Sequence, residues 1–121
     1  MIEYRKLILR SDLQNNRDKL FVFGDNAARR GYGGQAREMR GEPNAVGIVT
    51  KRTPSMDEEA FFTDEDFAFF MSESITDFRR LRKFKGTIVW PASDIGTGLA
   101  QLKERALMIW DAIPQLKQEL E

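Results

Sequence analysis

Two glycine-rich segments carry the backbone chemistry best suited to binding a ligand. The first is Gly31-Tyr32-Gly33-Gly34, and the second is Gly96-Thr97-Gly98, followed by Leu99. Glycine lets the chain turn with positive φ, so that N–H groups can approach an anion closely, and the segment after each loop favours a helix. The two segments together predict a phosphate site held between two helix N-termini. For either segment alone, a tight turn that needs glycine for steric reasons is an equal alternative.

Polar and basic residues accompany both segments. Asp25 and Asn26 stand just before the first one, and Lys51 follows an apolar run in the sequence Thr50-Lys51-Arg52. A lysine there can contact a phosphate or, if it loses its water shell, act as a nucleophile or base. A solvated basic pair is the alternative interpretation. Several basic residues near the first glycine segment favour a local anion site: Arg29, Arg30, Arg37, Arg40, Lys51 and Arg52.

Composition excludes several reaction classes. The 121 residues include no cysteine and no histidine, so thiolate chemistry, disulfides and the commonest general base are absent. Nineteen basic residues balance 19 acidic ones, which argues against a broad electrostatic grip on nucleic acid. The acidic run of residues 57–66 fits a solvated loop and helix start better than a metal site. We expect neither a metal nor a cofactor, because no Walker or complete Rossmann pattern is present.

The hydrophobic pattern predicts alternating strands and helices. Buried strands are expected at residues 20–23, 45–49 and 87–90, with a more polar edge strand at 2–9. Thr63 is expected to cap a helix that buries Phe67, Phe70, Met71, Phe78 and Leu81. A last helix should bury Leu99, Leu102, Ala106, Ile109 and Ile113 and end or kink near Pro114, and a short helix should run from Gly34 to Arg40. Residues 52–62 are expected to form a loop whose Phe61 and Phe62 pack on the core rather than stack on a base.

These elements predict one domain, residues 1–121, with a three-layer α/β/α fold and a mixed, largely parallel sheet. Ligands of such sheets gather at the carboxyl ends of the strands, so both glycine segments should lie at one edge. The N-terminus has no apolar signal region, and no apolar run approaches the ~20 residues that span a bilayer. We therefore expect a cytoplasmic protein without a membrane partner.

Three motifs in this order resemble the macrodomain family, which binds ADP-ribose. They are Asn26 followed after four residues by Gly31-Tyr32-Gly33-Gly34, the strand end Ile48-Val49-Thr50-Lys51, and Ile95-Gly96-Thr97-Gly98-Leu99. The resemblance covers residues 19–113 and is similar to the branch that removes ADP-ribose from acidic side chains or from thymine in DNA. It implies that Asn26 contacts the distal ribose, that Gly33 and Gly34 contact the diphosphate and ribose, and that residues 96–99 bind the diphosphate.

The same resemblance implies that Lys51 attacks the anomeric carbon in a hydrolase. The chain departs from that branch at Ala100, where the branch has an aspartate, and it is shorter than most macrodomains. Our first hypothesis is therefore a binding module for ADP-ribose or a related nucleotide, free or attached to a macromolecule. The alternatives are an ADP-ribosyl hydrolase that uses Lys51, with Asp25 or Asp94 replacing the missing acid, and a non-catalytic protein that sequesters a nucleotide or a partner. Oligomeric state is not predicted.

Overall fold

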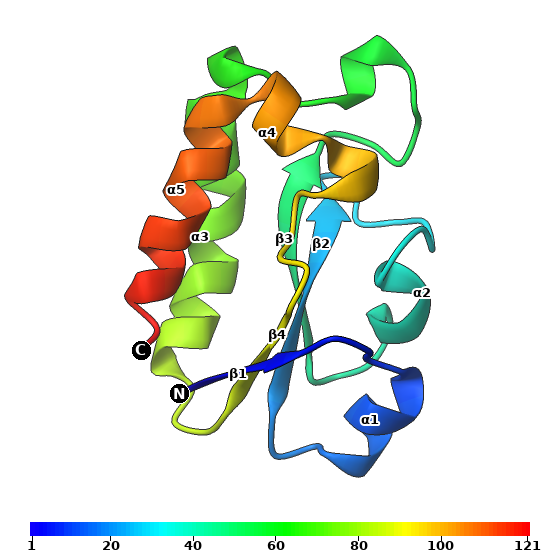
Figure 1. Cartoon of the computed structure of the whole chain (residues 1–121), viewed down its shortest axis with the longest axis vertical. Helices are drawn as coiled ribbons and strands as arrows, with labels where there is room; N and C mark the ends of the chain where they lie inside the picture. The colour runs from blue at the N-terminus through cyan, green and yellow to red at the C-terminus, as the bar shows by residue number, and fades with distance from the viewer.

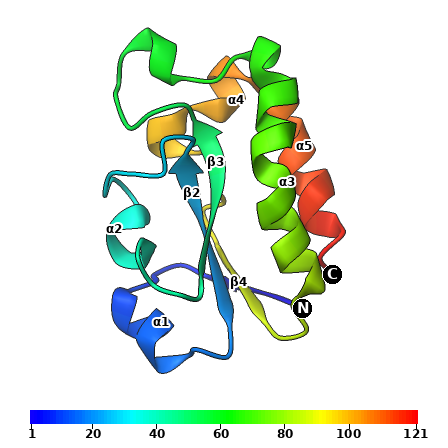
Figure 2. The same cartoon turned by 180° about the vertical axis from the view of Figure 1, so that it is seen from behind.

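The computed structural model describes all 121 residues and places a four-stranded sheet between two layers of helices (Figures 1 and 2). The strands are β1 (Ile2–Arg5), β2 (Leu20–Asn26), β3 (Ala45–Lys51) and β4 (Ile88–Pro91). Their order across the sheet is β1-β4-β2-β3, and every neighbouring pair is parallel. The predicted three-layer α/β class is therefore confirmed, with a sheet that is parallel throughout.

The helices divide between the two faces of the sheet. Helices α1 (Arg10–Asn15) and α2 (Ala36–Met39) cover one face, and α3 (Phe67–Lys83) and α5 (Leu107–Gln118) cover the other (Figures 1 and 2). Helix α4 (Leu102–Arg105) precedes α5, and 3₁₀ turns occupy Glu58–Ala60, Asp64–Asp66 and Gly98–Ala100. No helix combines the length and the apolar character that crossing a membrane requires.

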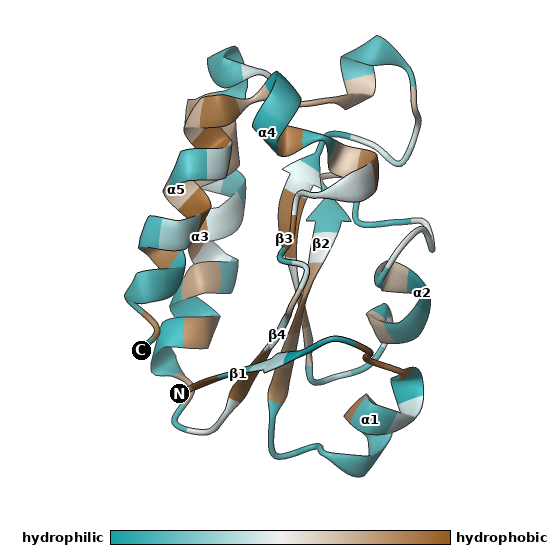
Figure 3. Ribbon diagram, in the orientation of Figure 1, coloured by the Kyte–Doolittle hydropathy of each residue, from teal (hydrophilic) through white to brown (hydrophobic).

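Alternate residues of β2 enter different apolar cores. Leu20 and Val22 belong to a cluster of 18 buried residues on the α3 and α5 side, whereas Phe21 and Phe23 belong to a cluster of seven on the α1 and α2 side. The two-residue period of a strand produces this alternation. Figure 3 shows the apolar middle of the sheet giving way to polar residues at the tips of β2 and β3. The prediction that this strand is buried on both faces is confirmed.

The N-terminal strand is shorter than predicted. The structure ends β1 at Arg5, on one edge of the sheet as expected, and begins α1 at Arg10. The Asp12 carboxylate accepts a hydrogen bond from the Leu9 N–H at 2.9 Å, which caps the start of this helix. Residues 6–9, predicted as strand, therefore lead into a helix that the apolar pattern did not reveal.

The helical prediction for α3 is largely confirmed. The Thr63 side chain accepts from the Glu65 N–H, and the Thr63 N–H donates to Asp66, which closes a capping box. Inside α3, Phe70, Phe78 and Leu81 are buried, whereas Met71 is 37% exposed. Upstream, Phe61 and Phe62 are buried as expected, although residues 58–60 of the predicted loop form a 3₁₀ turn.

The last predicted helix is two helices. The chain breaks at Ala106 (φ −144°, ψ 68°), and Leu99 is 55% exposed instead of packing on the core. Pro114 was predicted to end or kink the helix, but α5 continues through it to Gln118. A proline removes one backbone donor, and we attribute the continuation to the burial of Ile113 and Leu120 on either side of it.

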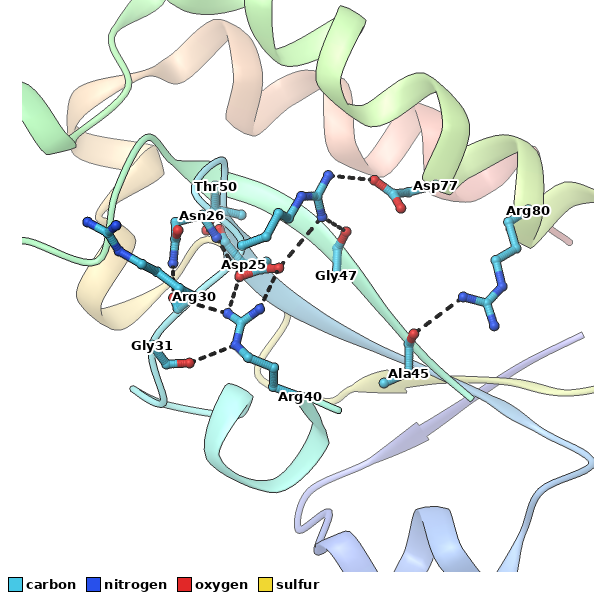
Figure 4. Close-up of polar contacts among 11 residues, drawn as sticks. Asp25, Asn26, Arg30, Gly31, Arg40, Ala45, Gly47, Thr50, Asp77 and Arg80 are labelled. Carbon is cyan, nitrogen blue, oxygen red and sulfur yellow. Dashed lines mark hydrogen bonds and ion pairs between the residues drawn. The ribbon is translucent and has the colours of Figure 1, made fainter. Parts of the chain in front are cut away.

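The outer edge of β3 is covered by arginine side chains (Figure 4). Arg29 Nη1 donates to the Gly47 carbonyl at 2.7 Å, and Arg29 Nη2 pairs with Asp77 of α3 at 2.9 Å. Arg80 of α3 donates to the carbonyls of Pro43 at 2.8 Å and Ala45 at 3.5 Å. Outward-facing carbonyls of this edge strand thus have partners from side chains.

Candidate functional site

The two glycine loops leave neighbouring strands and turn to opposite faces of the sheet. β2 leads into the first loop and α2 on one face, whereas its neighbour β4 leads into the second loop, α4 and α5 on the other. A parallel sheet opens a crevice at its carboxyl edge where adjacent connections diverge in this way. The topology therefore places the predicted site at the position where ligands of α/β proteins bind.

A cavity of about 430 Å³ occupies this crevice, within the range of small-molecule sites. Residues from both loops and from the ends of β2, β3 and β4 line it. The structure brings all ten residues of the predicted site to this cavity: Asp25, Asn26, Gly31, Gly33, Gly34, Lys51, Gly96, Thr97, Gly98 and Leu99.

The loop backbones offer hydrogen-bond donors. Gly31, Gly34, Gly96 and Gly98 have positive φ, as their glycine content predicts. None of the N–H groups of residues 31–34, 96 and 97 donates a hydrogen bond within the chain. The predicted contribution of two helix N-termini is small, because α2 and α4 are only four residues long. Any anion in this cavity would depend on the loop N–H groups themselves.

Charged side chains hold the first loop (Figure 4). Arg40, at the end of α2, donates to the carbonyls of Gly31 at 2.7 Å and Arg30 at 3.2 Å and pairs with both oxygens of Asp25. The Asp25 side chain is only 3% exposed, and Arg29 lies 3.6 Å from it. Asn26 Nδ2 also donates to the Arg30 carbonyl, at 2.7 Å. The Asp25–Arg40 ion pair and the hydrogen bonds from Arg40 therefore hold the first loop in place.

Packing and hydrogen bonds, without an ion pair, hold the second loop. Asp94 has a φ of 69°, and its Oδ1 accepts from Trp90 Nε1 at 2.8 Å and from the Ile95 N–H at 2.9 Å. The Gly96 carbonyl accepts from the Leu102 N–H at 2.9 Å. A Cβ added to Gly96 would lie 2.4 Å from Leu102 Cδ1, so the side chain of Leu102 packs directly against this glycine.

The two loops approach each other across the cavity. A Cβ built on Gly33 would lie 3.3 Å from Leu99 Cδ1. Leu99 is exposed because it extends toward the first loop and not into the core. Its predicted place among the buried residues of the last helix is wrong, but its predicted place in the site agrees with the geometry.

The cluster of basic residues separates into paired and free groups. Arg29, Arg40 and Arg52 form ion pairs with aspartates, which leaves them structural roles. Arg30 and Arg37 are exposed, and their guanidinium groups form no hydrogen bond or ion pair within the chain, but of the two only Arg30 lines the cavity. The basic cluster in the sequence indicated the anion site but could not distinguish Arg30 from its paired neighbours, since those partners lie far away along the chain.

Two side-chain oxygens beside the cavity are buried and have no hydrogen-bond donor. They are Asn26 Oδ1 and Gln35 Oε1, and both residues line the cavity. Asn26 was predicted from its spacing to the glycine loop. Gln35 was not, because a glutamine at the start of a helix carries no distinctive signal in a single sequence.

Lys51 ends β3 and reaches the cavity wall. It is 7% exposed, and its Nζ donates to the Ser55 carbonyl at 2.6 Å and lies 4.6 Å from the centre of the Phe61 ring. No carboxylate pairs with it. Burial lowers the pKa of the Lys51 amine, and the charge of Arg105 lowers it further.

The acids proposed to assist Lys51 have other partners. Asp25 is paired with Arg40, and Asp94 Oδ1 accepts the two hydrogen bonds described above, which leaves Asp94 Oδ2 without a partner. Ala100, at the position where the hydrolase branch has an aspartate, is buried beside the cavity. The structure gathers no group of three or more acidic, histidine or cysteine side chains able to hold a metal.

The fold and this cavity define the class of the molecule: a three-layer α/β protein with a cleft at the carboxyl edge of a parallel sheet. The chain belongs to the family of unknown function DUF7831, which it matches over residues 3–116. It matches no curated protein and no solved structure.

Proposed function

We propose that this protein binds a phosphate-bearing nucleotide of the ADP-ribose type, either free or attached to a protein or nucleic acid. One observation carries the proposal: both glycine loops, Asn26 and Lys51 line one cavity of about 430 Å³. The resemblance of these motifs to a macrodomain is the reason for proposing ADP-ribose as the ligand. Their shared position at one cavity supports the proposal, because a single ligand there could contact all of the motifs.

Each part of such a ligand has a chemical partner in the cavity. The free N–H groups of the loops are donors for a diphosphate, and Arg30 adds a positive charge at the rim. Asn26 Oδ1 lacks a donor, which a ribose hydroxyl would supply. Because the donors are backbone groups, the diphosphate contacts would survive most side-chain substitutions in the loops.

Calorimetric titration with ADP-ribose tests the proposal. The wild type should bind, and Gly33→Glu should abolish binding, because a carboxylate between the loops would repel the diphosphate. Gln115→Glu is the matched control, since it adds the same charge at an exposed position of α5. The proposal is wrong if the wild type gives neither heat nor a thermal shift with ADP-ribose.

The second candidate is an ADP-ribosyl hydrolase, which the buried, carboxylate-free environment of Lys51 favours. Lys51→Ala should then abolish release of ADP-ribose from a modified protein or DNA while binding is retained. The neutral amine is the nucleophile, and its pKa lies below the ordinary value, so the rate should rise with pH and level off below pH 10.5. Full activity in Lys51→Ala would exclude this role.

A further inference from the structure

The cavity contains acceptors that a phosphate cannot satisfy. Asn26 is 8% exposed, and its Nδ2 is committed to the Arg30 carbonyl at 2.7 Å, which fixes the orientation of the amide and leaves Oδ1 without a donor. Gln35 Oε1 is buried in the same condition, and its Nε2 makes no hydrogen bond. Phosphate oxygens only accept hydrogen bonds at neutral pH, whereas a hydroxyl can donate. The oriented Asn26 amide therefore calls for a hydroxylated ligand, and the Gln35 amide, which no hydrogen bond orients, can also accept from a hydroxyl.

The other polar groups of the cavity call for an anion on the same ligand. Backbone N–H groups of residues 31–34, 96 and 97 are free, and the Arg30 guanidinium has no partner. Donors for an anion and acceptors for hydroxyl groups thus line one cavity. A sugar phosphate carries both kinds of group within a few bonds.

The cavity lacks an aromatic surface for a nucleobase. Its lining contains no phenylalanine, tyrosine or tryptophan. Of its two carboxylates, Asp25 is paired with Arg40, and Asp94 Oδ1 accepts from Trp90 and Ile95, so that Asp94 Oδ2 is the carboxylate oxygen left for a base amino group. Sites that recognise bases stack them on aromatic or apolar surfaces and hydrogen-bond their edges.

The aromatic residues nearest the loops lie outside this cavity. Tyr32 is 64% exposed and does not line it. Trp110 lines a second, separate hollow of about 400 Å³ that shares residues 96–98 with the first. If the protein did bind a base, Tyr32 and Trp110 are the aromatic residues on which the base could stack. Variants of these two residues therefore serve as controls.

We propose that the cavity recognises a phosphorylated pentose and that the nucleobase of the ligand is not recognised. This inference rests on the proposed nucleotide-binding function and narrows it to the sugar-phosphate part. A ligand bound in this way keeps its affinity when its base is exchanged, and it is competed by a sugar phosphate without a base.

Calorimetry with three probes tests the inference: ADP-ribose, GDP-ribose and ribose 5-phosphate. We expect the dissociation constants of the first two to agree within about threefold, and we expect ribose 5-phosphate to displace ADP-ribose completely. A base whose edge is read by hydrogen bonds changes affinity by about tenfold or more when it is exchanged, so such a difference between the two nucleotides would overturn the inference. Stacking tolerates the exchange of one base for another, so a stacked base is tested by the Tyr32 and Trp110 variants instead. Failure of ribose 5-phosphate to compete would also overturn the inference. If ADP-ribose itself does not bind, the proposed function fails, which is a distinguishable result.

Two kinds of variant sharpen the test. Gln35→Leu removes an acceptor that holds no other part of the chain, so it should weaken ribose 5-phosphate and both nucleotides by the same factor, about fivefold. Tyr32→Ala and Trp110→Leu should leave unchanged the ratio of each nucleotide affinity to the affinity for ribose 5-phosphate. A change in that ratio in either variant would locate the base on that residue and overturn the inference.

Discussion

The two glycine loops line the same cavity but are supported by different physics. The first loop is fixed by the Asp25–Arg40 ion pair and by donation from Arg40 to two loop carbonyls. The second is fixed by Leu102 against Gly96 and by hydrogen bonds to Asp94, which forms no ion pair. The comparison teaches that one site can combine a loop whose shape depends on charge with another whose shape depends on volume. Removing a charge should therefore destabilise the first loop more than the second, whereas adding side-chain volume at Gly96 should destabilise the second loop.

The largest effect is expected from Arg40→Met. This variant leaves the Asp25 carboxylate buried with Arg29 alone, and breaking a buried ion pair costs about 3 kcal/mol. Urea unfolding should report this loss. The double variant Arg40→Met with Asp25→Asn should recover part of the stability, because the unpaired charge is gone, but not ligand binding. If the single variant is as stable as the wild type, the first loop is not held by charge.

A smaller effect, about 2 kcal/mol, is expected from Gly96→Ala. Its Cβ would meet Leu102 Cδ1 at 2.4 Å, and the φ of 81° adds strain. Gly98→Ala is the matched control, because Gly98 also has positive φ (57°) but nothing lies within 4 Å of its Cβ. The control should cost about 1 kcal/mol in the same unfolding experiment. Equal losses in the two variants would show that backbone strain alone, without packing, governs the second loop.

The smallest effect is expected from Asp94→Asn, below about 0.5 kcal/mol. Asparagine keeps an acceptor oxygen for Trp90 Nε1 and the Ile95 N–H and tolerates the φ of 69°. Thermal unfolding should hardly change, in contrast to Arg40→Met. A loss of 2 kcal/mol or more would mean that the second loop also depends on charge, and the distinction between the loops would fail.

Much of the fold could be predicted because local pattern determines it. The runs at residues 20–23, 45–49 and 87–90 are mainly apolar and bounded by turn residues, and they fall within β2, β3 and β4 except that β4 begins at Ile88. The order of strands and loops then placed both glycine segments at one edge of the sheet. Helix α1 was missed because it depends on a single cap. The sequence left open whether the last helix ends or kinks at Pro114, because the continuation of α5 depends on tertiary burial, which periodicity does not report.

The residues that line the cavity could be predicted from the sequence, but the contacts that hold them in place could not. Spacing identified Asn26, Lys51 and the glycine residues, all of which line the cavity. It could not identify which arginines stay unpaired, because partners such as Asp77, which binds Arg29 from 48 residues away on α3, are distant in the sequence. Nor could it show that Asp25, taken as a ligand contact and possible catalytic acid, is committed to Arg40.

The arginine side chains on the edge of β3 have a consequence for how this chain behaves among its own copies. An open edge strand is a template on which another polypeptide can add a strand, and such pairing begins aggregation. Because Arg29 and Arg80 already donate to the carbonyls of Gly47, Ala45 and Pro43, an incoming strand would have to displace charged groups before it could pair. The outer edge of β3 is thereby protected against pairing with a strand from another copy of the chain.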